Sequence, residues 1–274
     1  MRGGGRARAA RRRRSAARAR ARHVARGARA GGARVDARRR GGALRAAARA
    51  PRREPVAYVL GTREFWSCDL VVDRRVLIPR PETELLVETA LRLAPDARRI
   101  LDCATGSGAV AIAVARERRE ALVVASDVSP DALAVARANV ARHAPDVALV
   151  RADLLSAWCD GAFDLVVTNP PYVAEPDLAG LMPEVRDFEP RLALAAGPDG
   201  LDVLRVLLET AARVLRPGGW LVSEIGMGQG DALRARTARR AAWEPPVVLR
   251  DGAGIERIAG IRRTTQEERA WTRS

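Results

Sequence analysis

Short apolar runs alternate with longer amphipathic segments from residue 98 to residue 262 of the chain. The apolar runs have the length and composition of buried strands: 98–103, 121–127, 147–153, 163–169, 220–226, 247–250 and 255–262. The longer segments repeat apolar residues at helical spacing: 109–118, 130–143, 201–215 and 228–241. Parallel strands need crossover helices on both faces, so this alternation predicts an α/β fold with a doubly wound, mostly parallel seven-stranded sheet.

The segment before this alternation reads as a lead-in. Within 54–80, alternating Leu70 and Val72 together with Phe65 and Trp66 predict a small hairpin. Prolines 79 and 81 bracket a rigid loop, and 82–94 has helical spacing. We therefore expect residues 51–81 to form a hairpin and linker, and residues 82–274 to form the main domain.

Residues 1–50 have a different composition and carry the excess charge. They hold 18 arginines and one acid, Asp36, against 30 arginines and 32 acids in residues 51–274. With so few large apolar side chains the segment is expected to be disordered. Three interpretations stay open: a basic arm that touches RNA or the ribosome, a degenerate helical region, or an unnatural reading frame. No function is assigned to it.

The composition excludes several classes of chemistry. The chain has no lysine, which excludes a Schiff-base enzyme and a P-loop. Three widely spaced cysteines and two isolated histidines make no metal site, so no metal is expected. No apolar run of about 18 residues and no signal-peptide pattern occurs. We expect a monomeric, cytoplasmic protein that does not span a membrane.

The first candidate site follows the first strand of the alternation. Asp102 leads into a turn with Gly106 and Gly108, which directly precedes a helix. Such a turn lets backbone N–H groups approach a ligand, and the helix N-terminus favours a carboxylate or phosphate. A plain tight turn is the alternative interpretation.

The second candidate is Asp127, which ends the next strand 19 residues after Gly108. An acidic side chain there can accept hydrogen bonds from both ribose hydroxyls. Capping of the helix that begins near Pro130 is the alternative. The position at a strand end favours a ligand that contains adenosine.

The third candidate is the tetrapeptide Asn169-Pro170-Pro171-Tyr172, at the end of the fourth strand. The Asn169 side-chain oxygen and the Pro170 carbonyl can both accept hydrogen bonds from a planar NH₂ group. Tyr172 can stack on that group. The pattern favours a target whose nitrogen must be held in line with an electrophile.

Taken together, these motifs resemble a known enzyme family. The resemblance covers nearly all of 54–262 and rests on EPVAYVLGTREFW (54–66), LIPRPETE (77–84), LDCATGSGAVAIA (101–113), NPPY (169–172), FEPRLALAAGPDGLDVL (188–204), PGGWLVSEIGMGQG (217–230) and DGAGIERI (251–258). These segments resemble the peptide chain release factor glutamine methyltransferases, class I S-adenosylmethionine-dependent enzymes with a Rossmann-like fold.

The resemblance implies an activity and roles for individual residues. The activity would be methylation of the side-chain amide nitrogen of the glutamine in the Gly-Gly-Gln motif of release factors. Asn169 would be catalytic and, with Pro170, Pro171 and Tyr172, would bind that amide. The cofactor S-adenosylmethionine would lie against Ala104, Thr105, Gly106, Ser107, Gly108, Asp127, Asp153 and Leu154. For Asp153, which would reach the adenine amine, a loop cap is the alternative.

Two departures from the family pattern have consequences. Ala104 stands where the family usually has glycine, which matters if the backbone there needs a positive φ. Residues 1–50 do not resemble the helical recognition domain that the family places before the lead-in, which predicts weaker recognition of the release factor.

Other functions remain open. A glutamine methyltransferase of a ribosomal protein would use the same site. NPPY also suits an adenine-N6 methyltransferase of nucleic acid, with the basic arm as a contact, but no basic groove or separate recognition domain supports this. An inactive methyltransferase-like domain that binds RNA is a further alternative, against which the retained motifs speak.

Overall fold

The structure is a computed structural model that describes residues 53–265. The predictions for residues 1–50 lie outside the described residues. The helices are α3 (Val56–Leu60), α4 (Thr83–Leu93), α5 (Ala109–Glu117), α6 (Pro130–His143), α7 (Pro183–Arg186), α8 (Asp202–Val214) and α9 (Gln229–Ala238). The strands are β1 (Thr62–Phe65), β2 (Cys68–Val71), β3 (Arg99–Cys103), β4 (Leu122–Asp127), β5 (Ala148–Arg151), β6 (Phe163–Thr168), β7 (Leu215–Glu224), β8 (Val247–Arg250) and β9 (Glu256–Arg262).

Seven of the described strands form one sheet, in the order β5-β4-β3-β6-β7-β9-β8. The first five of these lie parallel, and β9 runs antiparallel to both β7 and β8. The predicted α/β class and mostly parallel seven-stranded sheet are confirmed. The order reverses between the neighbours β3 and β6, because the chain first builds outward to β5 and then returns. Open α/β sheets bind ligands outside the carboxyl ends of the strands at such a reversal.

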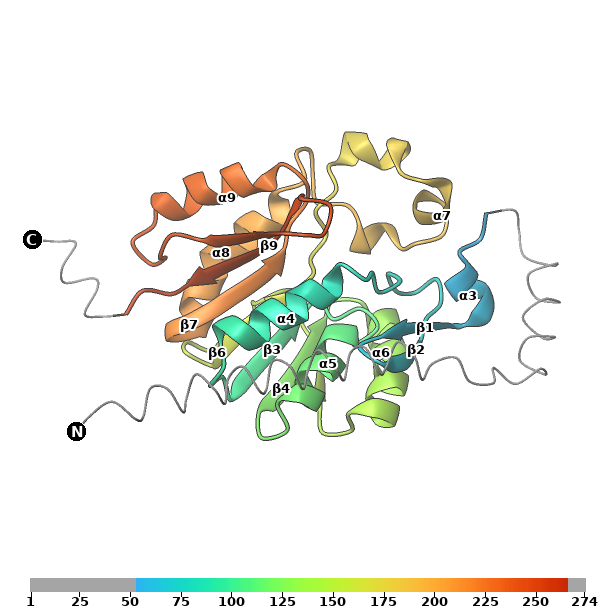
Figure 1. The fold of residues 1–274 in the computed structure, drawn as a ribbon, viewed down its shortest axis with the longest axis horizontal. Helices are drawn as coiled ribbons and strands as arrows, with labels where there is room; N and C mark the ends of the chain where they lie inside the picture. Colours follow the sequence, from blue (N-terminus) through green and yellow to red (C-terminus); the bar gives the residue numbers. More distant parts are fainter. Residues whose placement is uncertain (1–52, 266–274) are drawn as a thin grey trace, which may run out of the picture. The chain divides into compact units, whose positions relative to one another are not determined.

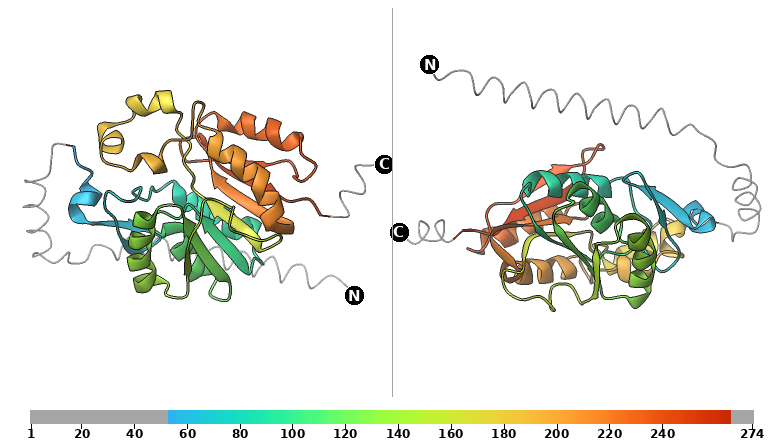
Figure 2. Two further views of the ribbon diagram at one scale, coloured as in Figure 1. Left: turned by 180° about the vertical axis from the view of Figure 1, so that it is seen from behind. Right: turned by 90° about the horizontal axis from the view of Figure 1, so that it is seen from below.

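Helices cover both faces of the sheet (Figures 1 and 2). The apolar sides of α4 and α5 pack with Ile100 and Val123 on one face, where α6 adds Val140. On the other face α8 packs against β6 and β7, and α9 adds Leu233. Strand β6 is buried along its whole length, as a central strand covered on both faces must be.

The predicted hairpin is present as β1 and β2, paired from Thr62–Val71 to Phe65–Cys68. It is joined to the main sheet by Asn139 of α6, which is fully buried. The Asn139 side chain exchanges hydrogen bonds of 2.7 and 2.9 Å with the backbone of Val71, and its Nδ2 also donates to the Ser107 carbonyl at 2.9 Å. One side chain thus fixes both the hairpin and the turn that follows β3.

Several boundaries differ from the sequence predictions. The short helix α3 precedes the hairpin, and the 3-10 helices η1 (Glu175–Gly180) and η2 (Arg191–Ala193) flank α7 in a stretch with no predicted helix. These pieces are shorter than the window in which periodicity is visible. Strand β7 begins at Leu215, not 220, because Leu215 already pairs with Phe163 before an irregularity in the ladder.

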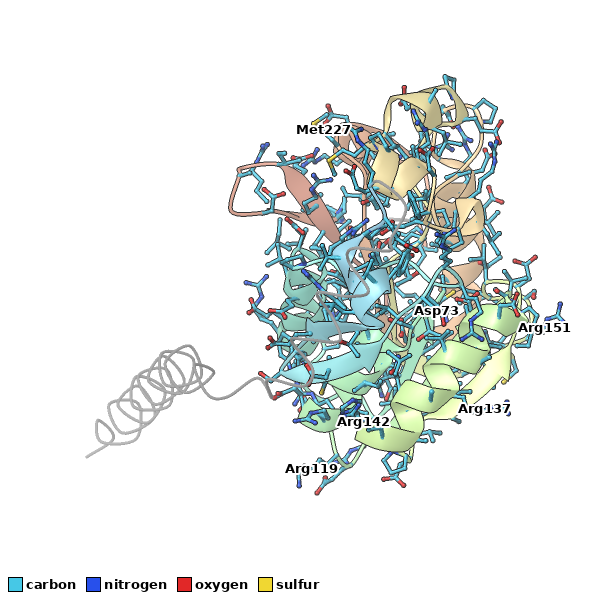
Figure 3. The ribbon with its side chains drawn as sticks, turned by 90° about the vertical axis from the view of Figure 1, so that its right-hand side faces the viewer. Asp73, Arg119, Arg137, Arg142, Arg151 and Met227 are labelled. Atoms are coloured by element: carbon cyan, nitrogen blue, oxygen red, sulfur yellow. The ribbon has the colours of Figure 1, made fainter. Side chains whose placement is uncertain are left out.

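Charged side chains project from the outer side of α6. Figure 3 shows Arg137 and Arg142 projecting outward from α6, on the side of the helix away from the core. Among the helices of residues 53–265, none combines the length and the apolar character that a membrane span requires.

Candidate active site

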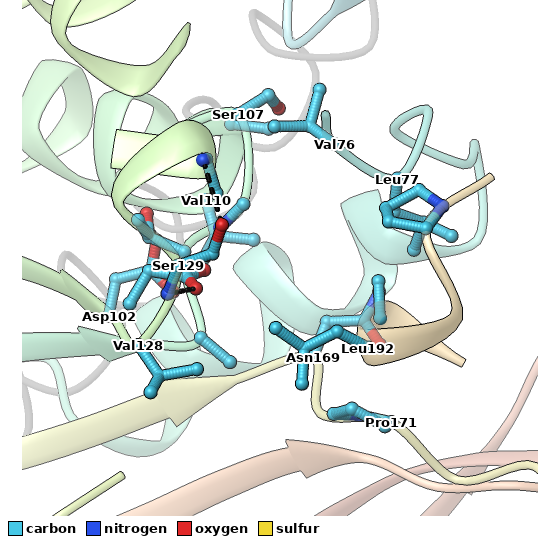
Figure 4. Close-up of a pocket in the computed structure, with 18 of the residues that line it drawn as sticks. Val76, Leu77, Asp102, Ser107, Val110, Val128, Ser129, Asn169, Pro171 and Leu192 are labelled. Atoms are coloured by element: carbon cyan, nitrogen blue, oxygen red, sulfur yellow. Dashed lines mark hydrogen bonds between the residues drawn. The ribbon is translucent and has the colours of Figure 1, made fainter. Parts of the chain in front are cut away.

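A cavity of about 230 Å³ opens at the carboxyl ends of β3, β4, β5 and β6. It therefore lies at the point where the strand order reverses. Figure 4 shows Asp102, Val110 and Ser129 on one side and Asn169, Leu192 and Leu77 on the other, across an open space. The glycine turn, Asp127 and Asn169, which come from three different strand ends, all line this one cavity.

The turn after β3 is held by a buried carboxyl group. Asp102 is 1% exposed and accepts hydrogen bonds from the Thr105 hydroxyl and from the backbone N–H of Ala111, the latter at 2.9 Å. Burial raises the pKa of Asp102 to about 7, against the lowering effect of these two hydrogen bonds. The side chain ties β3 to the first turn of α5 and so fixes the path of residues 104–108.

The backbone of the turn needs left-handed conformations. Ala104 has φ +59°, which places a β-carbon where glycine is favoured. The sequence left open whether alanine in place of glycine matters at this position. It does, because the backbone has a positive φ here and the alanine is strained. Gly108, at φ +83°, stands directly before α5 and does not line the cavity, whereas Ala104, Thr105, Gly106 and Ser107 do.

Asp127 lies beside this turn rather than on the helix that follows. One carboxylate oxygen accepts from the Gly106 N–H and the other from the Ser129 N–H, each at 2.9 Å. Ser129, not Asp127, caps α6, because its hydroxyl accepts from the Ala132 N–H. A carboxylate has about four acceptor positions, so each Asp127 oxygen retains capacity towards the cavity.

The third part of this wall follows β5. Asp153 is exposed and lines the cavity, and Leu154 beside it has φ +45°. The local turn is closed by the Asp153 backbone carbonyl, which accepts from both the N–H and the hydroxyl of Ser156. With Val128 and Ala132, Leu154 gives this end of the cavity an apolar surface.

The opposite wall is built by Asn169, at the end of β6. Its Nδ2 donates to the Thr83 hydroxyl at 3.2 Å, and both residues line the cavity. Pro171 also lines it, while Pro170 is buried beneath and Tyr172 lies outside the lining. The structure therefore brings two members of the tetrapeptide directly to the cavity and places the other two beside it.

Tyr172 is fixed from both ends. Its hydroxyl donates to the buried carboxylate of Glu224 at 3.3 Å, and its carbonyl accepts from Gln229 Nε2 at 3.0 Å. The pKa of Tyr172 is raised to about 12 by burial and by the Glu224 charge. Gly200 must be glycine here, since a β-carbon would come within 2.6 Å of the Tyr172 carbonyl oxygen.

An ion pair between Arg80 and Glu189 joins two segments whose neighbouring residues line the cavity. Arg80 Nη2 lies 2.7 Å from both carboxylate oxygens of Glu189, whose side chain is 1% exposed. Burial raises the pKa of Glu189, while Arg80 acts in the opposite direction. The pair holds Pro79 near Pro190 and Leu192, which line the same cavity.

Sequence reasoning missed three polar residues that hold the cavity wall: Thr83, which lines the cavity, and Glu224 and Gln229, which lie outside its lining. Thr83 lies in the RPETE segment, Glu224 in SEIG and Gln229 in MGQG, all inside the motifs that carry the family resemblance. Each is polar and buried. The available signal was a polar residue inside an apolar strand pattern or at a helix start, but the partners of these residues lie far away in the sequence.

Comparisons with known proteins show the family to which the chain belongs. A family model described as methyltransferase small domain matches residues 81–182. The release factor glutamine methyltransferase of Geobacter sulfurreducens is 45% identical over 215 residues, covering 78% of this chain and 75% of the relative. The chain belongs to the release factor glutamine methyltransferase family.

Further comparisons support this family and its fold. The release factor glutamine methyltransferase of Nitratidesulfovibrio vulgaris is 43% identical over 79% of this chain and 75% of its own length. A crystal structure of a methyltransferase from Pyrococcus furiosus superposes with a TM-score of 0.54 at 20% identity, over 72% of this chain and 89% of that one. This family member is thus a methyltransferase with the class I α/β fold.

Proposed function

We propose that this enzyme methylates the side-chain amide nitrogen of the glutamine in the Gly-Gly-Gln motif of class I release factors, with S-adenosylmethionine as the methyl donor. One observation carries the proposal: Asn169 and residues 104–107 of the turn line the same cavity from opposite sides. Residues 82–274 would be the methyltransferase domain, and residues 51–81 its lead-in. The names of the relatives support the release factor as substrate.

The residues of the β3–β5 side fit such a cofactor. Residues 104–108 would hold its methionine part, Asp127 its ribose hydroxyls, and Asp153 with Leu154 its adenine. The hydrogen bonds of Asp127 support the ribose contact. Backbone N–H groups orient both of its carboxylate oxygens, and each oxygen can still accept a further hydrogen bond. The apolar surface of Val128 and Leu154 suits a planar base. When bound, the cofactor supplies an electrophilic methyl group.

The residues of the β6 side would act on the amide. An amide nitrogen is a weak nucleophile because its lone pair is conjugated with the carbonyl group. Asn169 Oδ1 and the Pro170 carbonyl would accept its two N–H bonds, make the nitrogen richer in electrons and hold it in line for a single displacement. Orientation of this kind lowers a barrier by up to about 7–11 kcal/mol. The proton would then pass to water.

The test is methyl transfer from labelled S-adenosylmethionine. The full-length protein is incubated separately with a release factor, a ribosomal protein and DNA, and each product is analysed by mass spectrometry. We expect label on the Gly-Gly-Gln glutamine of the release factor. Label on a ribosomal protein or on adenine, with none on the release factor, would replace the proposed substrate.

A further inference from the structure

Glu224 is a buried carboxyl group at the carboxyl end of β7, behind the wall formed by Asn169. It is 4% exposed and does not line the cavity. Within residues 53–265, no arginine lies at ion-pairing distance from it. Its two oxygens instead accept hydrogen bonds from two hydroxyls: Thr83 at 3.0 Å and Tyr172 at 3.3 Å. Burying a carboxylate without a cation beside it costs free energy. Two hydroxyl partners do not by themselves explain why a carboxyl group stands here, which points to a further role for Glu224.

The hydrogen bonds form a chain whose direction is determined at Glu224. When Glu224 is ionised, its carboxylate only accepts, so the Thr83 hydroxyl then donates to it. A hydroxyl has a single hydrogen, so Thr83 can only accept from Asn169, which must present its NH₂ group at 3.2 Å. Thr83 is 3% exposed, and its hydroxyl lies between Glu224 and Asn169.

We propose that Glu224, acting through Thr83, fixes the side-chain amide of Asn169 so that its oxygen faces the cavity. This rests on the proposed function, in which Asn169 receives an N–H of the substrate amide. Glu224 is then a positioning residue, and Asn169 the residue that touches the substrate. Without these hydrogen bonds, the side-chain amide of Asn169 can rotate by half a turn and present its NH₂ group to the cavity in place of its oxygen.

The orientation has a consequence for the choice of substrate. An oxygen aimed into the cavity accepts from a nitrogen that bears hydrogens and repels a carbonyl oxygen. A rotated Asn169 would place its own NH₂ against the NH₂ of the glutamine, which leaves donors without acceptors. The chain from Glu224 therefore presents the nitrogen of the substrate amide, rather than its oxygen, to Asn169.

The charged surroundings of Glu224 are mixed. Burial raises the pKa of Glu224, and the charge of Glu82 acts in the same direction. The Thr83 and Tyr172 hydroxyls and the charge of Arg257 lower it. Both hydroxyls that donate to Glu224 therefore favour its ionised form.

The experiment compares variants that retain the hydrogen bonds from Asn169 through Thr83 to Glu224 with variants that break them. Glu224→Gln keeps the shape of the side chain but can accept from only one of the two hydroxyls. Thr83→Val keeps the volume but removes the hydroxyl, and Thr83→Ser retains it. Asp164→Asn is the matched control, because Asp164 is a buried carboxyl group, 6% exposed, at the other end of the sheet beside Arg98 and Arg99.

Kinetics with a release factor give the first readout. We expect Glu224→Gln and Thr83→Val each to lower kcat at least about tenfold, equal to about 1.4 kcal/mol, while the Kd for S-adenosylmethionine changes less than about twofold. Thr83→Ser should stay within about threefold of the native kcat. Asp164→Asn should lower the melting temperature and leave kcat unchanged. Equal kcat values for the valine and serine variants would overturn the proposal.

The second readout needs no activity, so it separates this proposal from the proposed function. The chain has only two asparagines, Asn139 and Asn169, so their side-chain NH₂ signals are readily assigned by NMR. We expect slowed hydrogen exchange at Asn169 in the native protein and faster exchange in Glu224→Gln, with Asn139 protected in both. Unchanged protection of Asn169 would overturn the orientation, whereas native protein that fails to methylate any release factor would overturn the function alone.

Discussion

The two walls of the cavity are built in different ways. On the β3–β4 side, the backbone does most of the shaping: the Asp127 carboxylate accepts from the Gly106 and Ser129 N–H groups, and both of these side-chain hydrogen bonds join residues no more than 21 positions apart. On the β6–β7 side, side chains do the shaping, and Thr83 meets Glu224 across 141 residues of sequence. A local turn can be recognised from its own residues, while a long-range hydrogen-bond chain exists only once the fold is complete.

The largest expected effect comes from Asn169→Ala. Loss of the oxygen that receives the substrate amide should lower kcat at least about a hundredfold, in the range seen when a transition-state contact is removed. The Kd for S-adenosylmethionine, measured by calorimetry, should change less than about threefold. Comparable losses in both quantities would show that the two walls do not act separately.

The converse pattern is expected for Asp127→Ala. Each hydrogen bond to a charged group contributes about 1.5–3 kcal/mol, so the Kd for S-adenosylmethionine should rise about 10- to 100-fold. At saturating cofactor, kcat should remain within about threefold of the native value. An unchanged Kd in the calorimeter would remove Asp127 from the ribose contact.

Asp102 predicts a pH dependence of stability on the first wall. Its carboxyl holds a proton at higher pH in the folded protein than in the unfolded chain, because its pKa rises from 3.8 to about 7. Between these values the folded state binds more protons, so the contribution of Asp102 to the free energy of unfolding falls as pH rises. Asp102→Asn keeps an acceptor for Thr105 and Ala111 but does not titrate.

Denaturant titrations of both proteins from about pH 4 to pH 7 measure this contribution. We expect the asparagine variant to gain stability relative to the native protein as pH rises through this window. A difference between the two proteins that stays constant with pH would place the Asp102 pKa near its ordinary value.

The smallest expected effect is a gain in stability from Ala104→Gly. Relief of the left-handed alanine, worth about 1–2 kcal/mol, is partly offset by the greater freedom of glycine in the unfolded chain. A net gain of about 0.5–1 kcal/mol should appear in urea titrations. Ala134→Gly, at an exposed position inside α6, is the control and should lose about 1 kcal/mol. A loss at both positions would contradict the strain at Ala104.

The sequence predicted the β3–β4 wall of the cavity better than the β6–β7 wall. The apolar runs gave the strands of the main sheet, and the position of Gly106 and Asp127 at strand ends gave the first wall. Asn169 was found because its tetrapeptide is local. Thr83 and Glu224 were not, because nothing near either residue in the sequence names its partner. Helix α7 and its flanking 3-10 turns escaped for a related reason: they are too short to show a period.

The proposed reaction depends above all on one contact, between Asn169 and the amide nitrogen that receives the methyl group. A crystal structure of the protein with a release factor and the demethylated product of the cofactor measures it directly. We predict the glutamine side chain in the cavity, with its nitrogen about 2.7–3.2 Å from Asn169 Oδ1 and facing the turn 104–108. A glutamine bound elsewhere, or one that presents its oxygen to Asn169, would contradict it.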